Sequence, residues 1–485
     1  MSARPDSRPP LVTPTVARTV APTLADPLVR WGAEGLGGRL GRRAALGSSW
    51  WTPLRVLVVL AVLAAGCGLL AKQSCRETGW TTPHQFVHVC YSDIPALYSA
   101  RGLDVGAVPY LDAKGAEPVE YPVLTGAAMW AAAQFVSEDA DNRALNYFDI
   151  NALWLAAALV IAVGATALTV RRRPWDAALV ALSPALVLAM YINWDLYAVA
   201  LTSLALLAWS RSRPVAAGIL LGLAVATKFY PLLLIGPLAL LCFRSGHLRE
   251  LGRTAAAAVL AWLAVNLPIA LADWDGWVTF YVFSAERGVG WSSFWLLFQL
   301  FGGEVPSKLN ILAAGSFIVG CVGIAALALT APRRPRLAQL CFLVIAAFVV
   351  TNKVYSPQYV LWVIPLAALA RPVWRDHLVF SVGQVIHFMG VWLYFVGLSN
   401  PDRGLSDTGY AWTILAHLAG TMWLVAMVIR DVLDPACDPV RSDQAGSDDP
   451  GGGPLDGAPD VVRLDPAAPR TWPRALAGAF GGVRA

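Results

Sequence analysis

The chain has 485 residues, of which 57% are hydrophobic and only 14% are charged, and its formal net charge is +5. A soluble globular protein carries about 25% charged residues, so this composition excludes an ordinary soluble domain. The basic residues occur in short clusters between apolar runs, which is typical of membrane topology signals and does not indicate a nucleic-acid-binding protein.

Composition divides the chain into three regions. Residues 1–50 are rich in Pro, Arg, Gly and Ala and lack apolar periodicity, so we expect a disordered cytoplasmic arm. Because the first apolar run comes only after this arm, it is predicted to be an uncleaved anchor and not a signal peptide. Residues 51–430 form the predicted transmembrane domain, and residues 431–485, rich in Pro, Gly and Asp, are predicted to be a disordered cytoplasmic tail.

An all-α polytopic membrane fold is predicted from twelve apolar segments, the shorter of which would be tilted or buried in the bundle. The predicted spans are 52–71, 147–170, 175–192, 196–210, 214–227, 231–243, 254–271, 308–331, 337–351, 358–370, 378–397 and 410–430. Arginine clusters follow the even-numbered spans, so a cytoplasmic N-terminus places all of these clusters, and both termini, on the cytoplasmic side. The apolar segments 121–136 and 291–302 are predicted to be interfacial or re-entrant helices, because a span at 121–136 would invert the topology after it.

The long first outer loop, predicted at 72–146, carries the candidate catalytic residue Asp93. A carboxylate at the membrane surface can act as a general base without the full cost of burying a charge in hydrocarbon. The alternative is that Asp93 merely caps the helix that follows it.

Two further pairs of residues stand out in the same loop. Cys75 and Cys90 are predicted to form a disulfide, because this loop lies on the oxidising side of the membrane in the predicted topology. His84 and His88 would share one face of a helix, but no third ligand accompanies them, so no metal site is predicted.

The candidate substrate-binding residues lie in the first outer loop or at the outer ends of the predicted spans. They are Glu120, Tyr121, Asn193, Asp195, Lys228, Tyr230, Arg287 and Lys353, of which Arg287 lies in the outer loop between the predicted spans 254–271 and 308–331. A lysine at headgroup depth can pair with a phosphate, and the alternative is simple extension of its ammonium toward the headgroups. Trp194 is interpreted either as an aromatic platform beside Asp195 or as an interfacial anchor.

Four motifs, taken together and in this order, resemble a known superfamily. They are Y-S-D-I-P-A-L-Y at 91–98, E-Y-P-V-L-T-G at 120–126, N-W-D-L-Y at 193–197 and A-A-G-I-L-L-G-L-A-V-A-T-K-F-Y-P at 216–231. The chain resembles the GT-C superfamily of polyprenyl-phosphate-sugar-dependent glycosyltransferases over roughly residues 50–430, and most closely the bacterial, mannosyltransferase-like glycosyltransferase family 87, which includes DUF2029-type membrane proteins. It departs from many relatives in having E-Y-P-V for Y-P-P and N-W-D for G-Q-x-N, which leaves the sugar and the acceptor open.

The resemblance implies a GT-C-like bundle in the bacterial plasma membrane with its active site on the outer face. It implies inverting transfer of a hexose, with mannose as the first choice, from a polyprenyl-phosphate sugar to a cell-envelope glycolipid or glycan. Asp93 would deprotonate the acceptor hydroxyl, and Lys228, Arg287 or Lys353 would hold the donor phosphate. Phosphate is a good leaving group, so no cofactor is required, and a divalent metal stays open.

Two other functions stay open from the sequence. A lipid or glycan transporter or flippase would favour ionisable residues near mid-membrane and internal repeats, whereas the acidic residues here gather at one surface and no repeat is seen. The second is a non-catalytic membrane partner, which no feature of the sequence separates from an enzyme.

Overall fold

The structure is a computed structural model that describes residues 26–32, 50–139, 141–400, 402–442 and 447–464. Most of the predicted N-terminal arm and the last part of the predicted tail therefore lie outside the described residues. Throughout the described part of the chain the regular structure is helical, and extended pairing is limited to an isolated bridge between Val108 and Asp112. The predicted all-α membrane fold is confirmed.

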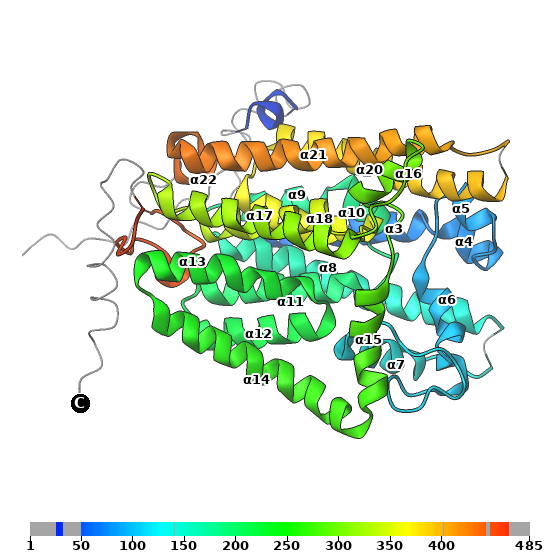
Figure 1. The fold of residues 1–485 in the computed structure, drawn as a ribbon. Coiled ribbons are helices and arrows are strands. Elements are labelled where there is room, and N and C mark those ends of the chain that lie inside the picture. The colour runs from blue at the N-terminus through cyan, green and yellow to red at the C-terminus, as the bar shows by residue number, and fades with distance from the viewer. Residues whose placement is uncertain (1–25, 33–49, 140, 401, 443–446, 465–485) are drawn as a thin grey trace, which may run out of the picture.

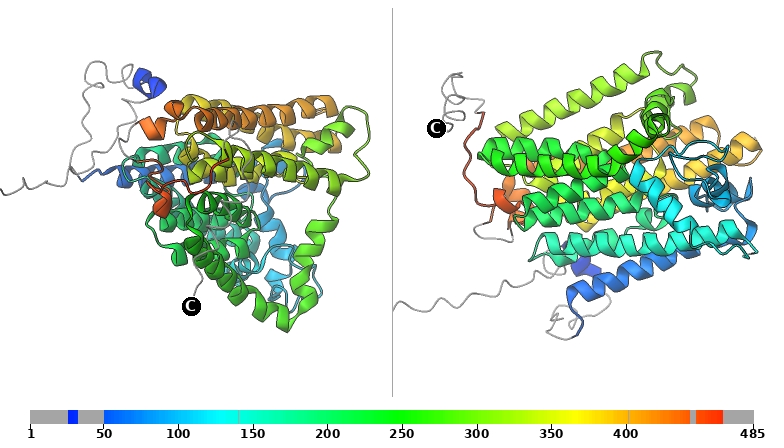
Figure 2. Two further views of the ribbon diagram at one scale, coloured as in Figure 1. Left: turned by 60° about the vertical axis from the view of Figure 1, so that its left-hand side comes forward. Right: turned by 90° about the horizontal axis from the view of Figure 1, so that it is seen from below.

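Within the described residues, six helices are long and apolar enough to cross a membrane. They are α3 (Pro53–Leu70), α8 (Arg143–Thr169), α14 (Leu248–Ala272), α17 (Leu309–Thr330), α20 (Trp374–Ser399) and α21 (Asp407–Leu433). Most of the shorter helices lie among them in one bundle (Figures 1 and 2): α9 (Ala178–Ala181), α10 (Pro184–Ala189), α11 (Asp195–Ser210), α12 (Pro214–Thr227), α13 (Ile235–Ser245), α18 (Leu337–Thr351) and α19 (Val360–Ala370). Each predicted span falls on one or more of these helices, and the count of twelve crossings stays a prediction.

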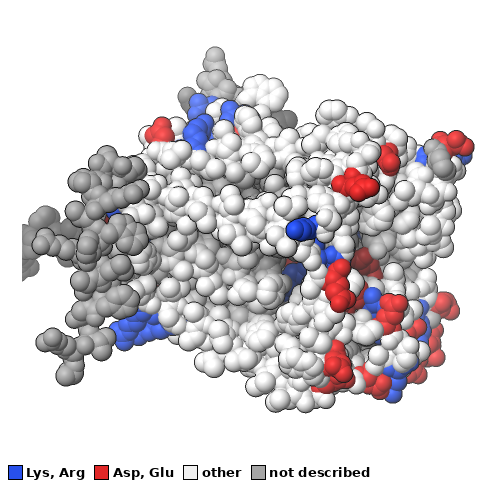
Figure 3. Space-filling view, in the orientation of Figure 1, with Lys and Arg blue, Asp and Glu red and all other residues white. Residues whose placement is uncertain are grey.

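The broad middle of the molecule presents almost no charged side chains on the face seen in Figure 3. Charged side chains gather instead over the end that carries the first outer loop, on the right in that view. An uncharged belt of this kind is what a bilayer requires, because a charge facing hydrocarbon costs several kcal/mol.

The two segments predicted to be interfacial or re-entrant form short helices. Residues 121–136 contain α7 (Val123–Ala133), whose 11 residues are too few to cross a bilayer alone. Residues 291–302 contain a 3₁₀ turn at Phe294–Leu296 followed by α16 (Leu297–Leu300). Their depth relative to a bilayer stays a prediction.

Helix α15 (Trp274–Glu286) was not expected from the sequence. It begins where Asp273 accepts a hydrogen bond from the backbone N–H of Gly276 at 2.8 Å, and it runs across the ends of the bundle helices near α7 (Figure 1). A Cβ at Gly276 would lie 2.0 Å from the carbonyl oxygen of Tyr110, so glycine allows α15 to rest directly on the backbone of the first outer loop. The segment is rich in aromatic residues, a composition typical of an interfacial loop, so the sequence did not predict a helix here.

The first outer loop forms a cap of short helices at the same end. It contains α4 (Gln73–Thr78), α5 (His84–Val87), α6 (Asp93–Ala100) and α7. Tyr110 anchors the start of α7, because its hydroxyl donates to the carbonyl oxygens of Tyr121 and Pro122, both at 2.9 Å. The first outer loop is therefore an ordered part of the fold that packs on the end of the bundle.

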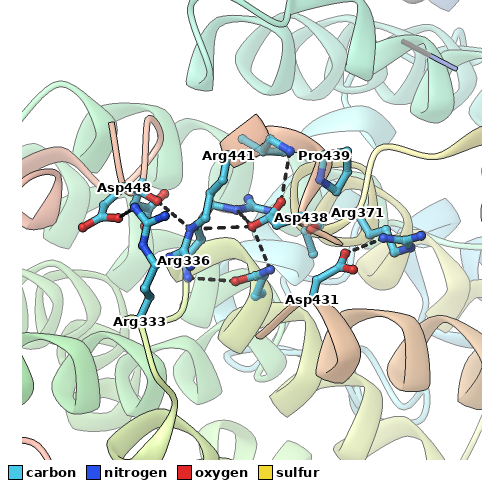
Figure 4. A network of polar contacts seen from close by, with 12 residues as sticks. Arg333, Arg336, Arg371, Asp431, Asp438, Pro439, Arg441 and Asp448 are labelled. Atoms are coloured by element: carbon cyan, nitrogen blue, oxygen red, sulfur yellow. Dashed lines mark hydrogen bonds and ion pairs between the residues drawn. The ribbon is translucent and has the colours of Figure 1, made fainter. Parts of the chain in front are cut away.

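The prediction of a disordered tail from residue 431 is wrong for the described part of that region. Helix α21 continues to Leu433, and residues 434–442 and 447–464 pack against the arginine-bearing helix ends opposite the first outer loop (Figures 1 and 4). Asp438 is fully buried and pairs with Arg336 at 2.8 Å, while Asp449 accepts the backbone N–H of Leu337 at 2.7 Å. A composition rich in Pro, Gly and Asp predicts a solvated, disordered segment. Here, however, the Asp438 carboxylate pairs with a buried arginine and the Asp449 carboxylate caps α18.

We predict that Asp438→Asn destabilises the protein by about 3–5 kcal/mol, because it leaves the buried Arg336 guanidinium without its counter-charge. The measurement is thermal unfolding of the purified protein in detergent. Glu304→Gln, an exposed carboxylate at the opposite end, is the control and should leave the unfolding midpoint unchanged. Equal unfolding midpoints for the two variants would show that the ion pair does not hold the segment in place.

Candidate active site

A cavity of about 790 Å³ lies at the end of the bundle that carries the first outer loop. Eight of the nine predicted site residues line it: Asp93, Glu120, Tyr121, Asn193, Lys228, Tyr230, Arg287 and Lys353. The ninth, Asp195, is buried directly behind Lys228. Residues from distant parts of the sequence thus meet in one chamber.

Asp93 is the first residue of α6 and is fixed by its backbone. Its N–H donates to the carbonyl oxygen of Ile192 at 2.7 Å, and the hydroxyl of Ser92 donates to the carbonyl oxygen of Tyr191 at 2.8 Å. Ser92 is also the helix cap, because its hydroxyl oxygen accepts from the N–H of Ile94. The alternative that Asp93 serves merely as the cap is therefore wrong, and its carboxylate faces the cavity.

The Asp93 carboxylate is held in an electrostatic setting suited to proton transfer. Tyr91 donates its hydroxyl to Oδ1 at 2.7 Å, and the hydroxyl of Tyr121 lies 3.5 Å from Oδ2. Burial raises the pKa of the Asp93 carboxyl to about 6, and Glu120 and Asp195 add to the rise, while the hydrogen bond from Tyr91 and the charge of Lys228 oppose it. A base works best when its pKa lies close to the working pH, so a carboxylate with this pKa can accept a proton near neutrality.

Two links tie the segment before Asp93 to the end of the first span. The predicted disulfide between Cys75 and Cys90 is confirmed, with a Cα–Cα distance of 5.8 Å. The ammonium of Lys72, itself buried, donates to the carbonyl oxygen of Tyr91 at 2.8 Å. Lys72 was not among the predicted site residues, because nothing in its sequence neighbourhood marks a buried lysine.

Lys228 follows the last residue of α12 and is oriented by an ion pair. Its ammonium lies 2.8 Å from Oδ1 of Asp195, whose Oδ2 accepts the indole N–H of Trp362 at 2.8 Å. The side-chain oxygen of Asn193 accepts the backbone N–H of Asp195. Asp195 therefore holds Lys228 in place and does not line the cavity as a sugar contact would.

Two of the predicted contacts are already engaged within the protein. Glu120 pairs with Arg101 at 2.7 Å, so its carboxylate is an oriented, partly satisfied acceptor on the cavity wall. The hydroxyl of Tyr230 donates to Thr202 at 3.2 Å, and its ring stacks on Trp362 with centroids 4.6 Å apart. Tyr230 therefore presents an apolar ring to the cavity.

Arg287 and Lys353 bring two more cations to the cavity. Arg287 follows α15 and is exposed, and the ammonium of Lys353 donates to the carbonyl oxygen of Ala285 at 2.7 Å. Burial lowers the pKa of Lys353, and the charge of Arg287 adds to that effect. Among the described residues no carboxylate forms an ion pair with either side chain, so their charge is available to a ligand.

Sequence reasoning missed part of the cavity and misplaced one aromatic residue. Phe86, Tyr91, Trp392 and Phe395 line the cavity, and none of them was predicted to be a site residue. Trp194, the expected aromatic platform, is instead buried and donates its indole N–H to Asn151 at 2.7 Å. The described residues contain no group of three or more His, Cys, Asp or Glu side chains placed to hold a metal ion.

Comparison with known proteins agrees with the motifs. Residues 121–351 match the model of glycosyltransferase family 87, which confirms the resemblance and supports glycosyl transfer as the activity. Asp93 lies before the matched range, so its role depends on the geometry described above. Among curated proteins none matches this chain.

One similar solved structure is that of ArnT from Cupriavidus metallidurans bound to undecaprenyl phosphate. The two chains are 14% identical, the match covers 78% of this chain and 77% of that chain, and the TM-score is 0.40. A likeness at this level carries no inference about the chemistry of this chain.

We predict that replacing both Cys75 and Cys90 with Ser lowers the stability of the cap by about 3 kcal/mol, the value expected for opening a loop of about fifteen residues. The measurements are thermal unfolding followed by intrinsic tryptophan fluorescence and limited proteolysis within residues 72–146. Cys67→Ser, at an exposed free cysteine in α3, is the control. If the double variant matched the wild type in both assays, the tether would be dispensable.

Proposed function

From the family match over residues 121–351, we propose that this chain is a membrane glycosyltransferase that moves a hexose, with mannose as the first choice, from a polyprenyl-phosphate donor. The acceptor is a hydroxyl of a cell-envelope glycolipid or glycan, and the transfer inverts the anomeric centre. The observation that carries the proposal is the meeting, in one cavity, of a carboxylate tuned to accept a proton and three cations.

The reaction balances with these groups alone. The acceptor oxygen attacks the anomeric carbon from the face opposite the phosphate, and its proton passes to Oδ2 of Asp93, the oxygen with the longer of the two tyrosine hydrogen bonds. As the new C–O bond forms, the bond between the anomeric carbon and the phosphate oxygen breaks, and its electron pair stays on the phosphate oxygen. Polyprenyl phosphate leaves with an additional negative charge, which Lys228, Arg287 and Lys353 are placed to stabilise.

The positions of charge support an outer-face enzyme over a transporter. The arginine-bearing helix ends lie opposite the cavity, as the positive-inside rule requires if the cavity faces outward. At that opposite end, residues 434–442 and 447–464 fill the space between the helix ends with buried ion pairs such as Arg336–Asp438. A bundle closed at one end and hollow at the other suits a reaction chamber.

We predict that Asp93→Asn lowers the transfer rate by a factor of about 10² or more, since it removes the base and keeps the shape of the side chain. The assay measures transfer of radiolabelled mannose from polyprenyl-phosphate mannose in membranes that contain equal amounts of each variant. Glu117→Gln, an exposed loop carboxylate, is the control. Near-full activity of Asp93→Asn together with loss of activity in Glu120→Gln would move the role of base to Glu120.

The same assay tests the acidity of Asp93. Because the active form is the carboxylate, wild-type activity should fall as the pH drops through about 6. The hydrogen bond from Tyr91 lowers the pKa of this carboxyl, so Tyr91→Phe should shift the acidic limb of the pH profile to higher pH. An unshifted limb would show that a different group titrates.

We predict that Lys228→Met raises the KM for the donor at least tenfold, because a phosphate would lose its best-oriented cation. Asp195→Asn should raise the same KM less, because it keeps the lysine and removes only the carboxylate that orients it. Initial rates at varied donor concentration and fixed acceptor measure both. Lys308→Met makes the same charge change at an exposed position of the same end, and a matching rise in KM there would attribute the effect to general electrostatics.

A further inference from the structure

One wall of the cavity is aromatic and carries no charge of its own. It consists of Phe86 and Tyr91 from the first outer loop and Trp392 and Phe395 from the last turns of α20, and we call these four residues the aromatic wall. Tyr91 packs on Trp392 with ring centroids 4.6 Å apart, and Phe86 contacts Tyr91, Trp392 and Phe395 at 5.9, 6.1 and 5.4 Å.

Lys228, the best-oriented cation of the cavity, lies over other rings. The ammonium of Lys228 lies over the rings of Tyr121, Tyr359 and Trp362, none of which is in the aromatic wall. In the described part of the chain, no lysine or arginine stands over any of the four wall rings, so their faces are not occupied by a cation. The cavity thus has a side that holds Lys228, which we call the cationic side, and a neutral aromatic side.

Asp93 lies where the two sides meet. Its Oδ1 is hydrogen-bonded to Tyr91, a member of the aromatic wall, and Lys228 is close enough to influence its carboxyl. A molecule resting on the aromatic wall therefore presents its groups to Asp93, while a phosphate on the cationic side presents the bond that breaks. This division assigns the wall to the molecule that carries the reacting hydroxyl.

We propose that the aromatic wall is the acceptor subsite and that it binds a neutral hexopyranosyl unit, so that the acceptor is itself a glycan or a glycosylated lipid. The proposal rests on the proposed function. Aromatic faces carry partial negative charge, and the C–H groups on one face of a pyranose ring carry partial positive charge, so a neutral sugar stacks on such rings without needing a counter-ion.

The place of the wall favours a sugar over the isoprenoid chain of the donor. Two of its four residues come from the loop 72–146, outside the membrane-spanning helices, and the other two lie near the end of α20 beside that loop. Trp291, which packs on Phe395 with centroids 5.3 Å apart, is half exposed at this rim. An isoprenoid chain belongs at the depth of hydrocarbon, whereas a headgroup sugar belongs at this level.

The test uses the purified full-length protein in nanodiscs, with polyprenyl-phosphate mannose as donor and octyl α-D-mannopyranoside as acceptor. Phe395→Ala and Trp392→Ala should each raise the acceptor KM roughly tenfold, as expected for loss of an aromatic contact, and leave the donor KM within about twofold. Trp392→Phe should recover most of the loss. Trp412→Ala, at an exposed tryptophan of α21, is the matched control and should change neither KM.

A binding arm separates this proposal from the proposed function. Saturation-transfer NMR with methyl α-D-mannopyranoside, without donor, should show contact with the wild type and loss of that contact in Phe395→Ala. Binding of this kind without any transfer by the wild type would support the wall and contradict the transfer activity. Wild-type transfer with an unchanged acceptor KM in both wall variants, or with a raised donor KM instead, would overturn the wall and leave the transferase standing.

Discussion

The contact on which the site depends is the docking of α6 onto the backbone of residues 191 and 192. Through it the N–H of Asp93 reaches the carbonyl oxygen of Ile192, and the hydroxyl of Ser92 reaches that of Tyr191. The same stretch of backbone continues to Asn193 and Asp195, and Asp195 forms an ion pair with Lys228. The candidate base and the best-oriented cation are therefore positioned by one continuous set of hydrogen bonds, although they lie 135 residues apart in the sequence.

The two ends of the bundle differ in whether all of the cations named here are paired. At the arginine-bearing end, Arg336 is buried and pairs with Asp438, and Arg371 is buried and pairs with Asp376 and Asp431 (Figure 4). The pairs of Arg336 with Asp438 and of Arg371 with Asp431 connect segments that are distant in the sequence. At the cavity end, Arg287 and Lys353 hold no ion pair within the described residues, and Asp93 accepts its hydrogen bonds from tyrosine hydroxyls. Unpaired cations beside a carboxylate of raised pKa are costly to maintain, and such a cost is typical of a functional site.

The sequence was informative where one physical signal dominates. Apolar runs located the bundle helices because hydrocarbon admits few other residues, and Cys75 and Cys90 could be paired because they share one loop on the expected oxidising side. The cavity is lined by Asp93 and by seven of the eight substrate-binding candidates, all but Asp195. Ionisable residues near an apolar belt face a cavity or the bundle interior, because exposure to hydrocarbon is unfavourable.

The failures have an equally physical cause, which is that they depend on partners distant in the sequence. Asp195 looks like a ligand contact until Lys228 is placed beside it. Trp194 looks like a platform until Asn151 is found to accept its indole N–H, and nothing in the sequence marks Trp392 as a neighbour of Tyr91 in the first outer loop. The composition of the tail predicts a solvated segment, because the sequence does not show that its carboxylates pair with buried arginines such as Arg336.

Helix α15 shows how the walls of the cavity and its charges are built by the same contacts. At its start, the absence of a side chain on Gly276 lets the helix rest on the backbone of Tyr110, whose hydroxyl also anchors α7. At its end, Lys353 donates to the carbonyl oxygen of Ala285, and Arg287 follows two residues later. A carbonyl oxygen carries no net charge, so the Lys353 ammonium fixes the helix end without entering an ion pair, whereas the Lys228 ammonium is paired with Asp195. The hydrogen bond from Lys353 to Ala285 therefore leaves the ammonium without a counter-charge. It also brings Lys353 close to Arg287, and we assign both cations to the phosphate.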